Sequence, residues 1–194
     1  MCYAKIYLGS NSPRRLQLLQ QLGLSVEVLK GEIDETVAEN ETASDYVLRM
    51  AISKNQQIRH LFPQKRDYPL LTADTCIAFN HQILGKPHSA EDAFTMLSML
   101  SGNTHQVLTA ICISTPIKQH YCLQSSEVSF KSLSAEEIHA YIASGEPFDK
   151  AGAYAIQGLA AGFIKHLSGS YSGVMGLPLF ETSELLKKFA INIF

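Results

Sequence analysis

Short apolar runs alternate with helical patterns along the chain, and this alternation restricts the fold more than any other feature of the sequence. Apolar runs and period-two alternation predict strands, whereas apolar residues at every third or fourth position predict helices. The predicted strands cover 5–8, 25–29, 70–73, 76–79, 106–115 and 127–133. The predicted helices cover 13–22, 44–61, 89–100, 134–144 and 179–189. Because strands and helices alternate and residues 70–84 have the pattern of a hairpin with a charged residue in its first arm, we predict an α/β fold with a mixed sheet.

The first predicted helix begins in an unusual way. Ser12 is a preferred N-cap residue and Pro13 is favoured at the first helical position. Arg14 and Arg15 then occupy the first turn, where the helix dipole favours acidic residues. Free amides, a hydroxyl and two guanidinium groups at one point can bind phosphate. The position alone equally allows two solvated surface arginines.

A charged residue interrupts an apolar run in the segment LLTADT, residues 70–75. A carboxylate buried without a partner is costly, so we predict that Asp74 lies at a strand break or strand end and faces a cleft. There it can bind a divalent metal ion or act as a base. The alternative is an Asp that caps a turn, which is less natural in the middle of a hairpin.

Three weaker features are also of interest. The stretch 27–45 holds seven acidic residues and one lysine, which usually indicates a solvated face. Lys86 stands between a glycine and a proline, so a stiff turn sets its direction, and it can either contact an anion or lie on a surface turn. The stretch 149–158 places polar groups among small residues that allow a backbone to approach a ligand closely.

Composition limits the classes of function. The 194 residues fit one domain, 1–194, and 46% apolar with 18% charged residues is typical of a globular chain. The net charge of −2 provides no general attraction to a nucleic acid polymer or an anionic membrane, so any phosphate recognition must be local. No apolar stretch is long enough to span a bilayer and no leader pattern is visible, so we expect a cytoplasmic protein.

Several familiar catalytic devices are absent from the sequence. The four cysteines, Cys2, Cys76, Cys112 and Cys122, form no C-x-x-C pair and are interpreted as reduced core thiols. The histidines are scattered, and the chain has no P-loop, dinucleotide-binding, H-E-x-x-H or G-x-S-x-G motif. Nucleophilic triads and histidine-based zinc sites are therefore disfavoured. The basic and acidic candidates together indicate a cleft for a phosphate ester with a metal ion.

Seven blocks in a fixed order carry a family resemblance. They are residues 10–15, 46–49 with Lys54, 73–75, 84–87, 100–102 with His105, 144–147 with 149–152, and 176–178. Over nearly the whole chain these blocks resemble the Maf family of nucleoside triphosphate pyrophosphatases, once described as septum formation inhibitors.

The resemblance implies a fold, an activity and partners. The implied fold is related to inosine triphosphate pyrophosphatases: an elongated, two-lobed body with a twisted mixed sheet, flanking helices and a central cleft. The implied reaction is hydrolysis of a nucleoside triphosphate between the α- and β-phosphates, which yields the monophosphate and pyrophosphate with a divalent cation, Mg²⁺ or Mn²⁺. The family also implies a homodimer.

The resemblance further implies roles for nine residues. Asp74 would activate water and share the metal ion with Glu35. The implied substrate-binding residues are Ser12, Arg15, Lys54 and Lys86 for the triphosphate, and Arg14, Thr75 and Gln157 for the base.

One branch of the family is similar to this chain at Arg14, Thr75 and Gln157, and that branch prefers dTTP and UTP. We therefore expect a house-cleaning enzyme for these nucleotides or their modified relatives. The branch that acts on 7-methyl-GTP usually has an aromatic residue after the proline. Specificity for 7-methyl-GTP, and a nucleotide-binding regulator of cell division with little turnover, are the alternatives.

Overall fold

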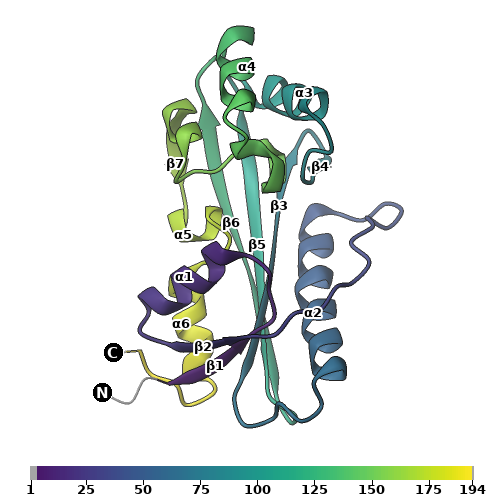
Figure 1. The fold of residues 1–194 in the computed structure, drawn as a ribbon, viewed down its shortest axis with the longest axis vertical. Helices are drawn as coiled ribbons and strands as arrows, with labels where there is room; N and C mark the ends of the chain where they lie inside the picture. Colours follow the sequence, from purple (N-terminus) through teal and green to yellow (C-terminus); the bar gives the residue numbers. More distant parts are fainter. Residues whose placement is uncertain (1–3, 194) are drawn as a thin grey trace.

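The computed structural model describes residues 4–193, which form a seven-stranded sheet with helices on both faces (Figure 1). The strand order is β2-β1-β3-β5-β6-β7, and β4 pairs with β3 beside this path. The strands are β1 (Lys5–Leu8), β2 (Ser25–Val28), β3 (Leu70–Phe79), β4 (Gln82–Leu84), β5 (Thr104–Ser114), β6 (Gln119–Phe130) and β7 (Ile164–Ser168). Pairs β1–β2 and β1–β3 are parallel and the others antiparallel, so the predicted mixed sheet is confirmed.

The α-helices are α1 (Pro13–Gln21), α2 (Ala43–Leu61), α3 (Ala90–Leu100), α4 (Ala135–Ala143), α5 (Tyr171–Val174) and α6 (Leu179–Lys187). Helices α1, α3 and α4 begin directly after the predicted N-cap residues Ser12, Ser89 and Ser134. Short 3₁₀ turns η1 (Glu146–Asp149), η2 (Ala151–Ala153) and η3 (Leu159–Phe163) follow α4. Ser89 caps α3, and Ser134 with Glu137 forms a complete capping box at the start of α4.

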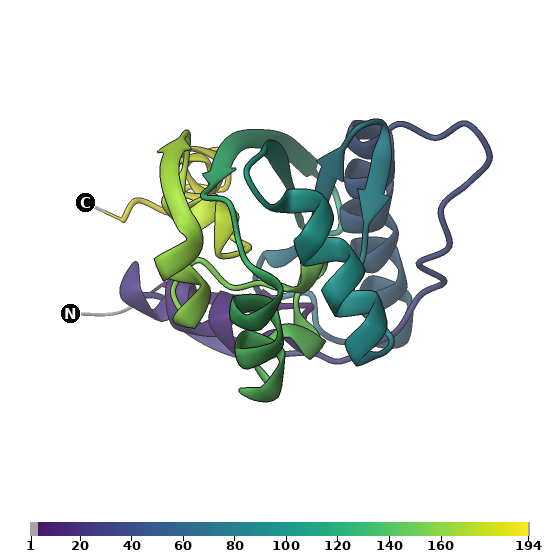
Figure 2. The same ribbon diagram turned by 90° about the horizontal axis from the view of Figure 1, so that it is seen from above.

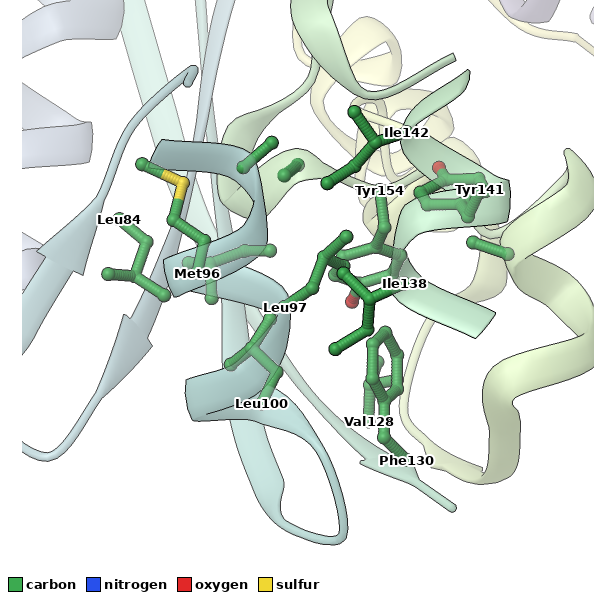
Figure 3. Packing of buried hydrophobic residues seen from close by; sticks show 14 of the residues in the cluster. Leu84, Met96, Leu97, Leu100, Val128, Phe130, Ile138, Tyr141, Ile142 and Tyr154 are labelled. Atoms are coloured by element: carbon green, nitrogen blue, oxygen red, sulfur yellow. The ribbon is translucent and has the colours of Figure 1, made fainter. Parts of the chain in front are cut away.

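The helices cover the sheet in a layered arrangement along an elongated body (Figure 1). On one face α2 packs over Cys76, Ala110 and Cys112 of the long central strands. On the other face, side chains of α1 and α6 pack over β1 and the first half of β3. At the far end α3 and α4 enclose a separate cluster around Leu97, Phe130 and several neighbours (Figure 3).

The middle of β3 has an open edge, and this gap positions the site. Below the gap β1 pairs with β3 at Leu70 and Leu71, and above it β4 pairs from Ile77 onward. Among residues 4–193 no strand pairs with 72–76 on this side. Consecutive strand residues point to opposite faces, so side chains from both faces of β3 can reach one cleft at this edge.

Two of the sequence predictions are wrong at β3 and β6. No break occurs at Asp74 and Thr75: β3 is continuous from 70 to 79, because both residues keep their pairing with β5 and a lysine neutralises Asp74. The predicted strand 127–133 is instead β6 over 119–130, whose alternation begins in its exposed half.

Several short elements lie in the glycine-rich stretch 146–178. It holds β7 and α5 as well as the three 3₁₀ turns. These elements are short, and their sequences show no full helical or strand period, so tertiary contacts rather than local patterns determine them.

The cysteines and the membrane prediction can be checked on the described residues. Cys76 and Cys112 are buried free thiols and Cys122 is half-buried, whereas Cys2 lies outside the described residues. Burial raises the pKa of the Cys76 thiol to about 12. Across 4–193, no helix has the length and hydropathy needed to cross a bilayer.

Candidate functional site

A cavity of about 770 Å³ lies at the open edge of β3. All nine residues singled out for site roles line it: Ser12, Arg14, Arg15, Glu35, Lys54, Asp74, Thr75, Lys86 and Gln157. They come from α1, the β2–α2 loop, α2, β3, the segment after β4 and the segment before η3. The fold therefore brings together residues that are up to 145 positions apart in the chain. Their individual roles stay predictions.

Arg15 is held rigidly inside this cavity. Its Nε donates to the carbonyl oxygen of Gly176 at 2.8 Å, Nη1 donates to Ser10 Oγ at 3.3 Å, and Nη2 donates to Thr75 Oγ1 at 3.1 Å. Gly176 has φ +114°, a conformation that glycine adopts without strain, and this turns its carbonyl toward the guanidinium. Burial lowers the pKa of Arg15, while the charge of Asp74 opposes that effect.

Ser12 occupies the N-cap position of α1, yet its side chain makes no capping hydrogen bond. The first turn of α1 also contains no acidic residue. The Ser12 hydroxyl and the backbone N–H groups of this turn therefore have no acidic partner within the turn, and Ser12 lines the cavity. This is the arrangement in which a helix start binds an anion, and Arg15 adds a fixed positive charge beside it.

Lys54 of α2 bridges two carboxylates on the opposite face of β3. Its Nζ lies 2.6 Å from Asp74 Oδ1 and 2.7 Å from Glu35 Oε1. Asp74 is 8% exposed, so the ammonium supplies the charge that a buried carboxylate needs. Burial acts to raise the pKa of Glu35, but the hydrogen bond from Lys54 and the nearby positive charges lower it overall. The Lys54 ammonium thus lies between Asp74 and Glu35, the two predicted metal ligands.

The long loop that carries Glu35 is fastened to α2. This segment, between β2 and α2, extends away from the body of the molecule (Figure 2). Tyr46 donates its hydroxyl proton to the carbonyl of Glu35 at 3.1 Å. Arg49 donates to both carboxylate oxygens of Glu41 at 2.6 Å and to the carbonyl of Thr36 at 2.9 Å. The Arg49 hydrogen bonds lower the pKa of Glu41 to about 2, so this clamp is ionised at neutral pH.

Three predicted residues remain, Arg14, Lys86 and Gln157, and they line the part of the cleft next to η1 and η2. Arg14 Nη1 lies 3.3 Å from Asp149 Oδ2, and Lys150 also pairs with Asp149. Lys86 follows Gly85, whose carbonyl accepts a 2.8 Å hydrogen bond from the N–H of Gly152. The turn that carries Lys86 is therefore attached to the turn after η1.

The loop that carries Gln157 is fastened by Glu146. One Glu146 oxygen accepts from the Tyr141 hydroxyl at 2.9 Å, and the other accepts from the N–H of Leu159 at 2.9 Å. Gly158 lies directly against this carboxylate, where a Cβ would collide with both oxygens. The position of Gln157 thus depends on a residue that sequence reasoning did not single out for its own role.

The donor set is compatible with a metal ion that the substrate helps to bind. Within residues 4–193, no group of three or more His, Cys, Asp or Glu side chains is arranged to hold a metal ion. However, Glu35 and Asp74 both reach one cationic centre, and Mg²⁺ is often held by one or two carboxylates together with substrate phosphates.

The model of the Maf-like protein family matches residues 5–189. The chain belongs to the Maf family. Among curated relatives, this Maf chain is 54% identical over 193 residues to the nucleoside triphosphate pyrophosphatase of Haemophilus ducreyi, with 98% of each chain covered. It is 50% identical over 196 residues to the dTTP/UTP pyrophosphatase of Pasteurella multocida, again with 98% of each covered.

Structural comparison agrees on the architecture. The Maf chain resembles the solved structure of the Staphylococcus aureus Ham1 protein with a TM-score of 0.52 and 12% identity, over 96% of this chain and 100% of the other. At this identity the likeness shows the fold alone. The predicted α/β fold with a mixed sheet and flanking helices is thereby confirmed.

Proposed function

We propose that this Maf protein is a dTTP/UTP pyrophosphatase that hydrolyses these nucleotides between the α- and β-phosphates. Water and the triphosphate are consumed, and the monophosphate and pyrophosphate are released. The observation that carries the proposal is the convergence of Arg14, Thr75, Gln157 and the charged groups in one cavity. Relatives about 50% identical over nearly the whole chain carry the name dTTP/UTP pyrophosphatase, which supports the same assignment.

The charges of the cavity are suited to a triphosphate. Arg15 and the start of α1 provide a fixed positive region on one face of β3, and Lys86 adds a further ammonium group from the segment after β4. Such groups position phosphates and offset their negative charge, which is the main requirement of phosphoryl chemistry. Lys54 can also contact a phosphate oxygen, because its ammonium has three N–H donors and the two carboxylates use only two of them.

Asp74 is proposed as the proton acceptor for the attacking water. Its Oδ1 is engaged by Lys54, and Oδ2 has no hydrogen-bond partner among residues 4–193. A carboxylate fixed through one oxygen can accept a proton on the other. The rigid central strand β3, paired with β5 along its length, holds this group in place.

Glu35 and Asp74 are proposed to hold the divalent cation, Mg²⁺ or Mn²⁺. A bound cation of this kind neutralises charge on the triphosphate and makes it more reactive toward water. The loop clamp through Tyr46 and Arg49 keeps Glu35 at the cavity before substrate arrives. We further propose a cytoplasmic homodimer, in agreement with the family expectation.

A nucleotide panel tests the proposed function. Purified full-length protein with Mg²⁺ or Mn²⁺ is incubated with dTTP, UTP, CTP, GTP and 7-methyl-GTP, and the products are separated by ion-exchange chromatography. We expect pyrophosphate and the monophosphate from dTTP and UTP at higher kcat/KM than from the other nucleotides. Orthophosphate as the product would overturn the bond assignment. Preference for 7-methyl-GTP, or binding without turnover, would favour the alternatives.

Matched variants connect the reaction to Asp74. Asp74→Asn removes the proton acceptor at unchanged size, so we expect kcat to fall by about 10²–10⁴-fold. Asp67→Asn is the control, because Asp67 is exposed in the loop before β3 and outside the cavity. Thermal unfolding of both variants verifies the fold. Full turnover by Asp74→Asn would remove Asp74 from the mechanism.

A further inference from the structure

A chain of hydrogen bonds leads from the cavity into the sheet. Arg15 Nη2 contacts Thr75 Oγ1 at 3.1 Å, Thr75 Oγ1 contacts Thr109 Oγ1 at 2.9 Å, and Thr109 Oγ1 contacts the carbonyl of Gly173 at 2.8 Å. Thr109 lies on β5 directly opposite Thr75 and is completely buried. It does not line the cavity, whereas Thr75 does.

The two ends of this chain determine the direction of its protons. A guanidinium N–H can only donate, a carbonyl oxygen can only accept, and each threonine hydroxyl has one proton. All three contacts are satisfied together only if Thr109 donates to Gly173 and Thr75 donates to Thr109. The proton of Thr75 then points into the sheet. One lone pair of Thr75 Oγ1 accepts from Arg15, and the other remains for a ligand in the cavity.

We propose that Thr109 is a positioning residue for nucleobase selection, because it makes Thr75 an acceptor, and not a donor, toward the cavity. The base edge that meets Thr75 must then carry an N–H group. This inference rests on the proposed function, since it concerns how the same site selects among nucleoside triphosphates.

The proposal explains a preference for uracil and thymine over cytosine. Uracil and thymine carry an imide N–H between two carbonyl oxygens, whereas cytosine has an unprotonated ring nitrogen at that position. Arg14 and Gln157, which line the same cavity, carry N–H donors suited to the two carbonyl oxygens. An acceptor that faces another acceptor leaves both without a partner, and a site built around hydrogen bonds rejects such a ligand strongly.

The test compares UTP with CTP in variants of Thr109. Thr109→Val removes the hydroxyl at nearly constant volume and frees the Thr75 proton to turn toward the cavity. We expect the ratio of kcat/KM for UTP to that for CTP to fall about tenfold, the effect of one hydrogen bond of this kind. Thr109→Ser keeps the hydroxyl and should keep the ratio. Thr109→Ala, which cannot clash, provides the same comparison if the valine variant does not fold.

A double-mutant cycle separates this role from a structural one. If Thr109 acts through Thr75, Thr109→Val should not change the ratio further in a Thr75→Val background. An unchanged ratio in folded Thr109→Val or Thr109→Ala, or an equal loss in Thr109→Ser, would overturn the inference. Absence of pyrophosphate release from UTP by the wild-type protein would instead overturn the proposed function.

Discussion

Arg14 on α1 and Asp149 on η1 form an ion pair across the cavity, with Nη1 and Oδ2 3.3 Å apart. The two residues are separated by 135 positions in the chain. Burial acts to raise the pKa of Asp149, but its pairing with Lys150 and Arg14 lowers it overall. The predicted base-reading arginine is therefore already oriented by a partner before a nucleotide binds.

This pair leads to a first prediction. Asp149 is 65% exposed, and exposed pairs contribute about 0–1 kcal/mol, so Asp149→Asn should lower kcat/KM for UTP by no more than about fivefold. Arg14→Lys loses the planar fork of donors and should raise KM for UTP by about tenfold. Steady-state kinetics measure both. A hundredfold loss in Asp149→Asn would mean that Asp149 contacts the substrate directly.

The bridge made by Lys54 leads to a second prediction. Lys54→Met keeps the apolar stem and removes the charge between Asp74 and Glu35, so unfolding should become easier by about 1–3 kcal/mol at pH 7. Repulsion between the carboxylates raises the pKa of at least one above its unfolded value. The stability of this variant should therefore increase as the pH falls through that raised pKa, and addition of Mg²⁺ should raise its melting temperature more than that of the wild type.

The control for this experiment is Lys131→Met, which breaks a more exposed pair with Glu137. Its melting temperature should respond to Mg²⁺ as the wild type does. An equal Mg²⁺ response in both lysine variants would count against a cation site at Glu35 and Asp74.

The clamp formed by Glu146 leads to a third prediction. Glu146→Ala removes the acceptor of the Leu159 N–H, and Gly158→Ala forces the carboxylate out of its place. Both changes should displace Gln157 and raise KM for UTP about tenfold with kcat nearly unchanged. This pattern is expected when a contact that binds the substrate and the transition state equally well is lost. Gly162→Ala is the matched control, because a Cβ there meets nothing within 4 Å. An equal effect of all three changes would refute the clamp.

His105 leads to a prediction about pH. It is 2% exposed, and its Nε2 lies 2.7 Å from the Tyr154 hydroxyl. Burial lowers its pKa from 6.5 to about 4, so between these values the unfolded chain binds more protons than the folded one. Stability should therefore be complete above pH 6.5 and fall by on the order of 3 kcal/mol as the pH decreases to 4.

Urea unfolding at a series of pH values measures this effect. Part of the pH dependence between 6.5 and 4 should disappear in His105→Gln and persist in His60→Gln, which changes an exposed histidine near the end of α2. Identical profiles for His105→Gln and the wild type would assign the acid sensitivity to other groups.

Sequence patterns predicted those helix starts that depend on contacts between residues close together in the chain. The capping residues of α3 and α4 mark helix starts because their side chains bond to backbone N–H groups only three positions away. The predicted break at Asp74 is wrong for the converse reason. The charge that stabilises this carboxylate comes from Lys54 on another element, 20 positions earlier, and no pattern around Asp74 reveals it.

The candidate site shows the same limit. Four of the family blocks contain seven of the nine predicted site residues, whereas Glu35 and Gln157 lie outside the seven blocks. The residues that hold them are harder to find. Thr109 meets Thr75 only because β5 pairs with β3 in one register, and Glu146 meets Leu159 only after the chain has turned back through η1 and η2. Such pairings require the folded topology.

The open edge of β3 places two chemically different tasks on consecutive residues. Asp74 faces α2 and pairs with Lys54, whereas Thr75 faces α1 and accepts a hydrogen bond from Arg15. A shift of one residue in the pairing of β3 with β5 would exchange these faces. An insertion or deletion of one residue in this strand should therefore turn the Asp74 carboxylate toward α1 and the Thr75 hydroxyl toward α2. The backbone hydrogen bonds between β3 and β5 thus keep the residue proposed for hydrolysis and the residue proposed for base selection on separate faces of the strand.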